Sequence, residues 1–496
     1  MIGNNLPVLI VVVPLLAALV IPLVRKGNVA WFVAMTACIA VFAGAIELLV
    51  RVSDHGPISY ALGNWPPPIG IEYRIDRLNA FVLLIVSGIS VVVTLFARLS
   101  VAREIPADRV HFFYSAYLMC ITGLLGITIT GDAFNLYVLL EISSLATYTL
   151  VAMGAQPHAL RASFNYLVLG TIGATFLLIG IGHLYMATGT LNMLDLHQRL
   201  PSLMESRTVR SGFAFIIVGA SLKLALFPLH LWLPSAYTHA PSAVTALLAA
   251  TATKVGAYIL LRFLFTIFGV GFSFHVLRAD VALLIAAAVA IVAGSLIAIR
   301  QQNVKRMLAY SSIAQIGYIT LGIGLASVTG LTAGILHLFN HALMKGALFL
   351  ALGCVVYRVG SAHIDALAGL GRRMPWTFAA FTLAGLSLIG IPPTAGFISK
   401  WYLVRAAFET GWWPIAVLVL VGSLLALIYI WRVVEAAYFR PAPRAHRNVE
   451  EAPLSLLVPT WILVLANLYF GIDTDLSVGA ASRAAAMLLG TVTGSP

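Results

Sequence analysis

The segment Ser221-Leu-Lys-Leu-Ala-Leu-Phe-Pro-Leu-His-Leu-Trp-Leu-Pro234 governs the predicted fold of the whole chain. It places a lysine, Lys223, inside an apolar run that is interrupted by proline. Because proline lacks an N–H group and clashes with the carbonyl four residues earlier, Pro228 should free the carbonyl of Leu224. In lipid, freed backbone is tolerated only where protein or a water-filled cavity surrounds it. The segment therefore predicts a broken membrane helix with a lysine in an ion path. A lysine that reaches from a helix end to the membrane interface is the simpler alternative.

The composition extends this interpretation to the whole chain. Of its 496 residues 60% are hydrophobic and only 10% are charged, whereas soluble domains carry roughly 25% charged residues. Apolar runs of about 20 residues, long enough to cross a bilayer, recur throughout. The net charge of +12 is scattered over short loops, which does not fit a nucleic-acid-binding face. We therefore expect an all-α polytopic membrane protein with the lipid bilayer as its solvent.

We expect fourteen membrane-spanning helices, of which the seventh and the twelfth are discontinuous. The segment 191–207 is expected to form an interfacial helix instead of a span. The predicted spans are roughly 6–24, 29–50, 78–98, 111–130, 133–153, 162–186, 211–236, 242–268, 279–299, 304–326, 329–357, 376–406, 412–437 and 454–471.

The distribution of basic residues predicts the orientation. If the N-terminus is outside, sixteen Lys and Arg residues fall on the cytoplasmic side and ten on the other side, and four lysines lie inside spans. Because cytoplasmic loops are enriched in Lys and Arg, this bias favours a protein of the inner (plasma) membrane with both termini on the outer, periplasmic side.

A weak internal repeat suggests how the chain is divided. Ser143-Ser-Leu-Ala lies 168 residues before Ser311-Ser-Ile-Ala, and Lys223 lies 177 residues before Lys400. An offset of five helices would invert the second unit, which is an architecture of transporters. The expected regions are an N-terminal three-helix region (1–110), two inverted five-helix repeats (111–268 and 279–437), and a C-terminal span with a tail (438–496). The matches are short, so chance similarity remains an alternative.

Further ionisable residues lie inside the predicted spans. Glu141 and Lys254 are each in the middle of an apolar run. The residues His337, His341 and Lys345 recur at positions i, i+4 and i+8, so they should share one helix face. Lys400 follows a second break at Pro392 and Pro393, whose rings should free the carbonyls of Leu388 and Ile389.

This set of one acid, four lysines and two histidines suits proton relay. Burial disfavours the charged form of a lysine, and a nearby carboxylate such as Glu141 beside Lys223 favours it. Histidine exchanges protons near neutral pH through its two ring nitrogens. The set contains neither a nucleophile with its base nor carboxylate metal ligands, so we expect no catalytic residues, no metal and no cofactor. Structural roles for each histidine, and a helix-end role for Lys345, remain open alternatives.

The motifs around these residues resemble a known family. Leu-Glu141-Ile-Ser-Ser, the long segment that runs from Lys223 to the Ala-Pro-Ser ending at Ser242, the face from His337 to Lys345, and Gly390-Ile-Pro-Pro-Thr-Ala-Gly-Phe-Ile-Ser-Lys400 are similar to the antiporter-like subunits of respiratory complex I and of Mrp-type cation/proton antiporters. Within the family, the loop 63–76 and the segment Gly189-Thr-Leu-Asn-Met-Leu-Asp-Leu resemble the Mrp antiporter component called D, and Lys400 argues against the complex I component called M, which carries an acid there. The complex I component called N shares a lysine in the same Pro-Pro-Thr-Ala-Gly-Phe context.

The resemblance implies a proton-translocating subunit of a multisubunit Na⁺(K⁺)/H⁺ antiporter, which is no enzyme and has no redox cofactor of its own. Its partners would be other subunits of a hetero-oligomeric complex, H⁺ and a monovalent cation, and no nucleic acid. Its polar axis would run through Glu141, Lys223, Lys254, the face of span 11 and Lys400. The alternatives are a proton-pumping subunit of complex I or of a membrane-bound hydrogenase or formate hydrogenlyase complex, a lipid-linked glycosyltransferase, and a membrane scaffold. A scaffold would not explain four lysines in spans, and a glycosyltransferase would need an acidic pair near a span end.

Overall fold

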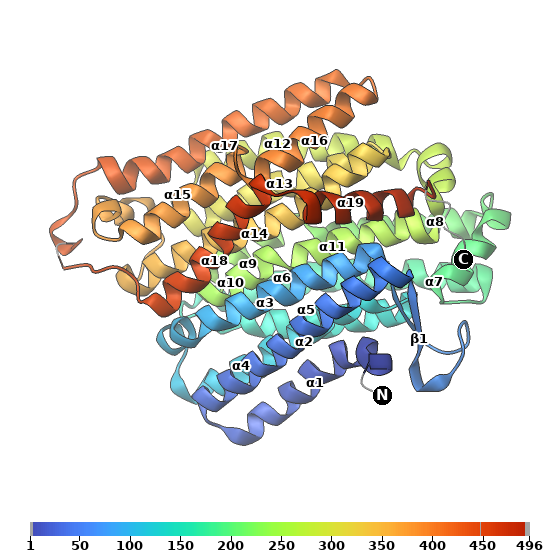
Figure 1. The fold of residues 1–496 in the computed structure, drawn as a ribbon, viewed down its shortest axis with the longest axis horizontal. Coiled ribbons are helices and arrows are strands. Elements are labelled where there is room, and N and C mark those ends of the chain that lie inside the picture. The colour runs from blue at the N-terminus through green and yellow to red at the C-terminus, as the bar shows by residue number, and fades with distance from the viewer. Residues whose placement is uncertain (1–2, 447, 492–496) are drawn as a thin grey trace.

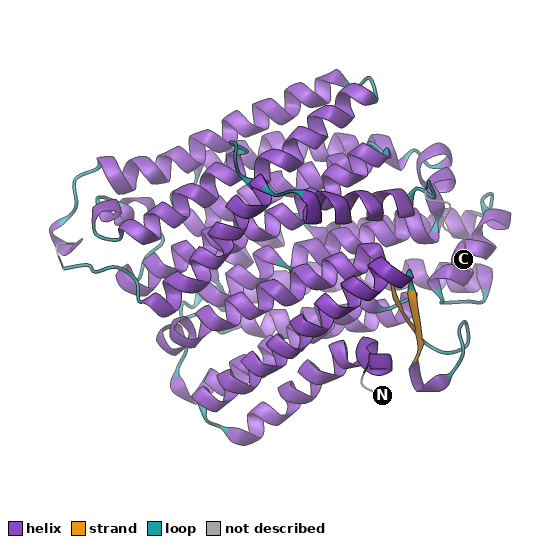
Figure 2. Cartoon of the chain, in the orientation of Figure 1, coloured by secondary structure: helices purple, strands orange, loops and turns teal. Residues whose placement is uncertain are grey.

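The computed structural model describes residues 3–446 and 448–491, and within them helices dominate (Figures 1 and 2). The helices of the first half are α1 (Leu6–Val24), α2 (Gly27–His55), α3 (Arg77–Glu104), α4 (Val110–Ile129), α5 (Ala133–Ala152), α6 (His158–Thr188), α7 (Met193–Arg199), α8 (Arg207–Leu224), α9 (Trp232–His239), α10 (Ser242–Ala250) and α11 (Ala252–Leu261). Those of the second half are α12 (Ala279–Arg300), α13 (Val304–Gly324), α14 (Val328–Val359), α15 (Pro375–Ile389), α16 (Ala395–Glu409), α17 (Trp413–Phe439), α18 (Leu454–Ile472) and α19 (Asp475–Leu488).

The long helices lie side by side along one direction of the molecule (Figure 1). In the described part of the chain, eleven helical segments are long and apolar enough to cross a membrane. The three other predicted spans fall on α13 and on the two broken pairs, α8 with α9 and α15 with α16. The prediction of an all-α polytopic membrane protein with discontinuous seventh and twelfth spans is therefore confirmed.

Both predicted breaks are real, and each begins with a left-handed residue. The helix α8 ends at Leu224, and Ala225 follows with φ of 61°. Pro228 lies in the connection to α9, beyond the end of the helix, so α8 stops before the proline instead of kinking at it. In the second break, Gly390 has φ of 90°, and Pro392 and Pro393 lie between α15 and α16.

A third break was not predicted. The segment 242–268, expected as one continuous span, is interrupted at Thr251, whose φ of −126° and ψ of −55° separate α10 from α11. After α11 the chain continues in two π-helical segments, Arg262–Ile267 and Gly271–Val276. Threonine is not a helix breaker on the scale of proline, and π turns have no sequence signature of this strength, so the apolar pattern alone predicts an uninterrupted helix.

One end of the bundle carries additional structure. The strands β1 (Ile58–Ala61) and β2 (Glu72–Ile75) form an antiparallel hairpin in which Ile58 pairs with Ile75. Asp76 then begins α3 with a capping box, in which its side chain accepts from backbone N–H groups and the Asn79 side chain accepts in return. The short helix α7, the hairpin and both chain ends lie at this end (Figure 1). We call it the hairpin end.

The helix α19 was expected only as a C-terminal tail. It packs against α14 and α3 and buries alanines such as Ala481 and Ala484. Its residues are too polar for a span, so it does not stand out among the apolar runs of the sequence.

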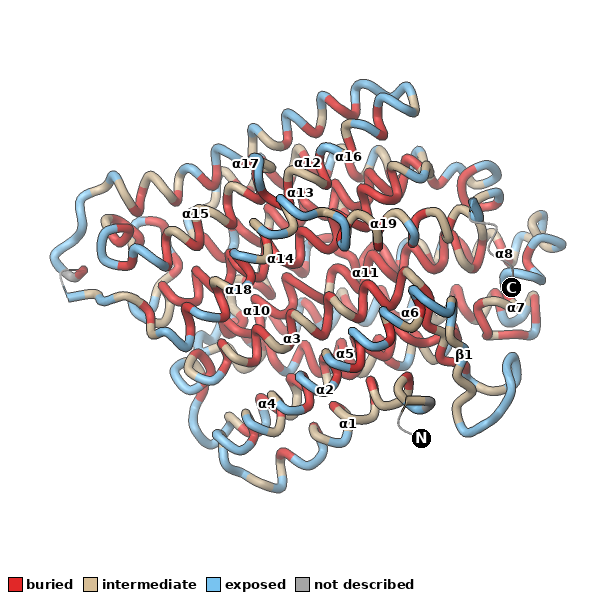
Figure 3. Tube along the Cα trace, viewed as in Figure 1, coloured by how far each residue is buried: buried red, intermediate tan, exposed pale blue. Residues whose placement is uncertain are grey.

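The core runs through the middle of the bundle. The helices α10, α11, α13 and α14 are almost entirely buried, whereas α1 and α17 alternate between buried and exposed residues (Figure 3). Large apolar side chains such as Leu23, Leu424 and Phe439 are exposed on these outer helices, as expected for a surface that contacts lipid or another apolar protein surface.

Candidate functional site

Lys223 lies in the last turn of α8, just before the first break. Its Nζ donates a hydrogen bond of 2.9 Å to Ser144 Oγ on α5. A cavity of about 30 Å³ lies beside it, with walls from α4, α5, α6, α8 and α11. That volume is sufficient for a water molecule. Lys223 is therefore held by a neutral hydroxyl at the edge of a small space inside the bundle.

Glu141 lies on α5, one turn before Ser144, near Lys223 but not in direct contact with it. Among the described residues no ion pair of 4.0 Å or less joins Glu141 to Lys223, although Glu141 is near enough to interact with it electrostatically. The buried Oε1 atom of Glu141 has no hydrogen-bond partner in the protein. Phe134, Val138 and Leu145, on the same helix, are exposed apolar residues. Glu141 thus lies between the interior and an outer face of α5.

Lys254 lies in the first turn of α11, immediately after the third break, and is fully buried. Its Nζ contacts the carbonyl of Ala249, at the end of α10, and lies 3.4 Å from Thr253 Oγ1. The helix α11 packs tightly against the end of α8, because a Cβ on Gly256 would lie 2.9 Å from the Cα of Leu224. The break between α10 and α11 therefore provides the carbonyl that solvates Lys254, which also lies near the negative end of the α10 dipole.

The long helix α14 carries His337, His341 and Lys345, all three with no exposed surface. His337 bonds through Nδ1 to Ser399 Oγ at 2.8 Å and through Nε2 to Gln315 Oε1 at 2.9 Å. Lys345 donates to the carbonyl of Leu308 at 2.8 Å and to Ser311 Oγ. These contacts link α14 to α13 and α16.

His341 lies between these two residues, and neither of its ring nitrogens has a partner in the protein. Its ring lies at 9° to that of His337, with 6.1 Å between the centroids. A buried polar group without a partner is uncommon and calls for an explanation such as an internal water or a functional role.

Lys400 lies in α16 and reaches back into the second break. Its Nζ donates to the carbonyls of Leu388 and Ile389 at 3.0 and 2.9 Å, the two carbonyls expected to be freed. It also donates to Ser423 Oγ at 2.9 Å and lies 4.8 Å from the centre of the Tyr318 ring. Gly396 is required here, because a Cβ at this position would collide with the carbonyl of Ser387.

The structure brings most of these residues into one electrostatic series. Lys254 interacts with His341 and Lys345, and His337 interacts with Lys400. Glu141 and Lys223 form a separate pair, and the cavity beside Lys223 reaches the wall of α11. Both serine pairs of the weak repeat contact a lysine, since Ser144 binds Lys223 and Ser311 binds Lys345.

Lys223 and Lys400, in contrast, do not occupy equivalent positions in their broken helices. Lys223 precedes its break, and Lys400 follows the other one. The 177-residue spacing of the two lysines therefore does not align the breaks themselves.

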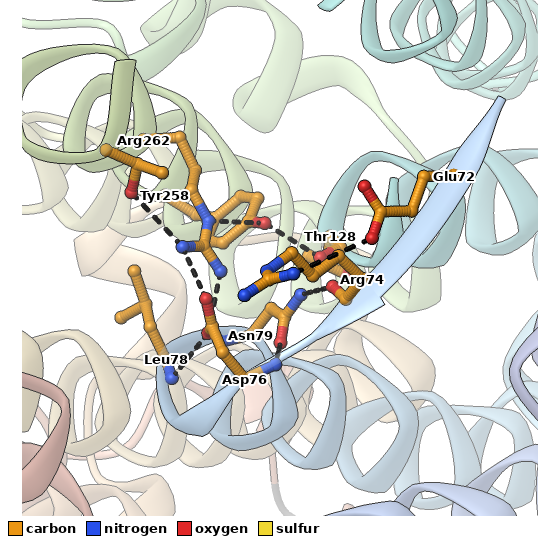
Figure 4. A network of polar contacts seen from close by, with 9 residues as sticks. Glu72, Arg74, Asp76, Leu78, Asn79, Thr128, Tyr258 and Arg262 are labelled. Carbon is orange, nitrogen blue, oxygen red and sulfur yellow. Dashed lines mark hydrogen bonds and ion pairs between the residues drawn. The ribbon is translucent and has the colours of Figure 1, made fainter. Parts of the chain in front are cut away.

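A buried ion pair at the hairpin end is a feature that the sequence did not predict. Asp76 accepts two bonds of 2.7 Å from the guanidinium of Arg262, whose Nε donates to Tyr258 Oη at 2.9 Å (Figure 4). Tyr258 in turn donates to the carbonyl of Thr128 at 2.8 Å. Arg262 lies inside the predicted span 242–268, and nothing in the sequence assigned it a partner.

The surroundings of Asp76 differ from those of Asp132, another buried aspartate at the start of a helix. Burial alone would raise the pKa of Asp76, but the charge and hydrogen bonds of Arg262 outweigh it and hold that pKa below the usual value. Burial raises the pKa of Asp132, which has only backbone N–H donors to oppose it. Of these two aspartates, only Asp76 therefore depends on a cationic partner.

The arrangement can hold and pass protons, but it offers little for bond-making chemistry. Within the described residues, no group of three His, Cys, Asp or Glu side chains is placed to bind a metal. The cysteines Cys38, Cys120 and Cys354 are buried and unpaired. The residues that contact the buried lysines are hydroxyls and carbonyls, which solvate an ammonium without fixing it as a carboxylate would.

Comparisons with known proteins identify the family of the chain. Residues 130–426 match the family model described as NADH:quinone oxidoreductase/Mrp antiporter, membrane region. The chain is 41% identical over 486 residues to the N component of the NADH-quinone oxidoreductase of Desulforudis audaxviator, covering 95% of this chain and 96% of that protein. It is 30% identical over 488 residues to the D component of the Na⁺/H⁺ antiporter of Bacillus subtilis, covering 98% of this chain and 97% of that one.

Solved structures show the same similarity. A chain of the Mrp complex from Dietzia aligns with a TM-score of 0.90 and 27% identity over 99% of this chain and 98% of that chain. A chain of the membrane-bound sulfane sulfur reductase, an archaeal respiratory membrane complex, aligns with a TM-score of 0.89 and 32% identity over 98% of both. The chain belongs to the NADH:quinone oxidoreductase/Mrp antiporter family of membrane proteins.

Proposed function

We propose that the chain is the proton-translocating subunit of a multisubunit Mrp-type Na⁺(K⁺)/H⁺ antiporter. Protons would move along Glu141, Lys223, Lys254, His337, His341, Lys345 and Lys400. The break at Pro392 and Pro393 would supply the carbonyls that solvate Lys400, and the break that contains Pro228 would leave Lys223 at the end of its helix. Relatives named as antiporter subunits support this function, and they support a transport subunit in place of an enzyme. The solved relatives are parts of multisubunit membrane complexes, which supports a hetero-oligomeric assembly.

The observation that carries the proposal is the absence of an anionic partner at three buried lysines. In the described part of the chain, Lys254, Lys345 and Lys400 have at most 5% exposed surface and bond only to carbonyls and hydroxyls. A permanently charged ammonium buried without a counterion is costly. An amine that takes up and releases a proton avoids that cost during part of each cycle. A purely structural lysine would be expected to have a carboxylate partner.

His341 supports the same function. Its two unbonded ring nitrogens lie between Lys345 and His337. An imidazole can accept a proton on one nitrogen and release one from the other. In a relay these nitrogens are used alternately, and so fixed partners would be a disadvantage.

The test is cation-driven proton movement in the purified complex. In vesicles that hold a pH gradient, addition of NaCl or KCl should dissipate the gradient, and choline chloride should not. The variant Lys254→Met should lose this activity because it removes the amine with little change in volume. The matched variant Thr253→Ala removes only the neighbouring hydroxyl and should retain most of it. Normal exchange by an assembled Lys254→Met complex would remove Lys254 from the path.

A second function is favoured by the relative that is 41% identical, because its name is that of a component of NADH-quinone oxidoreductase. In that case the chain would pump protons within a respiratory complex or a hydrogenase-type complex, driven by electron transfer. The proteins that co-purify with the chain distinguish the two functions. Small antiporter subunits would support the first, and subunits with iron–sulfur clusters would support the second.

We also propose the internal organisation and the orientation. The regions 111–268 and 279–437 would be two inverted units, each containing a helix that is broken beside a lysine. Both termini would face the outside of the plasma membrane, so that the hairpin end is the outer end. The second unit would then open toward the side opposite to the first.

A further inference from the structure

A cavity of about 470 Å³ lies at the hairpin end of the bundle. Its walls include Arg74, Asp76, Thr130, His197, Arg262 and Val270. Arg74 is balanced by Glu72 at 3.6 Å, and Arg262 by Asp76. The side chain of Arg74 has 32% of its surface exposed, whereas those of Arg262 and Asp76 have 5% and 9%. The walls of the cavity are therefore mainly apolar, with a few charged groups that balance one another. The cavity is open outward, and the buried ion pair lies on its inner wall.

Behind the ion pair, one helix leads to the centre of the proton path. Lys254, Tyr258 and Arg262 follow one another at positions i, i+4 and i+8 of α11 and its π-helical continuation. Such residues share a helix face, and eight residues of helix span about 12 Å. Tyr258 is fully buried and bonds to Arg262 (Figure 4). The face therefore connects a fully buried lysine to a cavity that reaches the surface, and π turns often occur at functional sites.

We propose that this cavity is the vestibule through which protons leave or enter at the hairpin end, and that Tyr258, Arg262 and Asp76 form the gate between it and Lys254. The proposal rests on the proposed function, since it assigns one end of the path. The structure shows the gate closed. Both oxygens of Asp76 hold the Arg262 guanidinium, and the positive charge of Arg262 repels a proton that approaches from Lys254.

The proton step needs only water as the acceptor of the proton. An N–H bond of the Lys254 ammonium breaks, leaving a neutral amine, and the proton joins a water oxygen to form hydronium, which passes Tyr258 and enters the cavity. Arg262 stays protonated throughout, because a guanidinium does not release its proton in proteins. Opening requires the Arg262 side chain to turn toward the cavity, where water can solvate it.

The first experiment blocks the cavity. Val270→Cys is introduced into the assembled complex, and a cationic, membrane-impermeant methanethiosulfonate is added from the outer face. The native cysteines are buried and should not react. Labelling should reduce cation/proton exchange at least tenfold, and a reducing agent should restore it. Ser202→Cys, an exposed position at the same end that does not line the cavity, should be labelled with no loss of exchange.

Each outcome decides a different point. Complete labelling of Val270→Cys with unchanged exchange overturns the vestibule. If Val270→Cys does not assemble, Leu489→Cys supplies a second position in the cavity wall, and unchanged exchange after its complete labelling has the same meaning. Absence of exchange in the unmodified complex before any reagent is added contradicts the proposed function instead, so the two failures are distinguishable.

The second experiment tests the gate through its charge. Asp76→Asn keeps an oxygen that can cap α3 but removes the partner of Arg262. Exchange per assembled complex should fall at least tenfold, and it should recover to within threefold in the double variant Asp76→Asn/Arg262→Gln. Asp132→Asn changes a buried capping aspartate that has no cationic partner, and should retain exchange. If Asp76→Asn lowers only the amount of complex and leaves exchange per complex unchanged, the pair is structural and the gate is wrong.

Discussion

Lys400 is the residue whose surroundings say most about its role. It is bound by the carbonyls of Leu388 and Ile389 and by one hydroxyl, with no carboxylate among its contacts. If the residue must lose and regain a proton, arginine cannot replace it, since a guanidinium stays charged. We expect Lys400→Arg and Lys400→Ala both to lose cation/proton exchange in a complex that still assembles, as measured by the decay of a pH gradient in vesicles and by native gel.

The matched control is Lys305→Arg. Lys305 is also buried and donates to a carbonyl, that of Ala240, but it lies in the first turn of α13 and outside the proposed path. Unlike Lys400, it has a carboxylate, that of Glu104, near enough to interact with its charge. This variant should keep exchange. A result in which Lys400→Arg is active while Lys400→Ala fails to assemble would make Lys400 a fixed structural charge.

Glu141 is the acid of the proposed path, and its role in exchange can be tested without disturbing the fold. Its buried oxygen makes no hydrogen bond in the protein, so removing the side chain breaks no contact of that atom. We therefore expect Glu141→Ala to assemble normally and to abolish exchange. Glu47→Ala removes an acid from the exposed ion pair with Arg51, which is worth at most about 1 kcal/mol, and should leave exchange unchanged. Normal exchange by Glu141→Ala would exclude it from the mechanism.

At the scale of elements, α14 carries three path residues on one face, and they should act as one unit. His337→Ala and Lys345→Ala should each slow exchange, and His341→Ala should have an effect of similar or smaller size. Because relay members act together, the double variant of His337 and Lys345 should be little slower than the slower single variant. Thr332→Ala, which removes a buried hydroxyl bonded within α14, is the control. Losses that multiply would indicate separate structural roles.

The first helix break gives a prediction about stability. Ala225 has φ of 61°, a left-handed conformation that costs an L-residue roughly 1–2 kcal/mol and that suits glycine. Ala225→Gly should therefore raise the melting temperature of the complex or leave it unchanged. Ala225→Val should lower it, since a β-branched residue is poorly tolerated at this φ. A lower melting temperature for the glycine variant than for the valine variant would contradict this account of the break.

The helices and their breaks also show which parts of the structure could be predicted from the sequence. Fourteen apolar runs and two proline-interrupted spans predicted the helices, because apolar length and proline chemistry act locally. The break at Thr251 and the helix α19 were missed, because neither has a strong local signal. The pair of Asp76 and Arg262 was missed because its partners are 186 residues apart and meet only through packing. For the same reason the sequence did not predict the hydrogen bond from Lys223 to Ser144.

At the scale of the whole molecule, the outer surface carries many apolar side chains and suits contact with lipid, whereas the interior holds the polar residues of the proposed path. The outer helices α1 and α17 alternate between buried and exposed residues (Figure 3), and many of the exposed ones have large apolar side chains. The residues of the proposed path lie on α5, α8, α11, α14 and α16. Glu141 is the member nearest to an outer face, on the same helix as the exposed residues Phe134, Val138 and Leu145. A carboxylate that faced lipid there would be costly, which fits an assembly in which another subunit covers this face of α5.

The orientation of the whole molecule in the membrane is predicted from the distribution of its Lys and Arg residues. Ser202 lies in the connection after α7 at the hairpin end, and Asp108 lies in the connection between α3 and α4; both are exposed. Because most basic residues outside the spans flank the end that holds Asp108, that end should face the cytoplasm. In intact cells, a membrane-impermeant thiol reagent should label Ser202→Cys and should reach Asp108→Cys only after permeabilisation. The native cysteines are buried, so the chain without either substitution is the background control. Labelling of Asp108→Cys alone in intact cells would invert the orientation, and it would place the cavity lined by Arg262 and Asp76 on the cytoplasmic side.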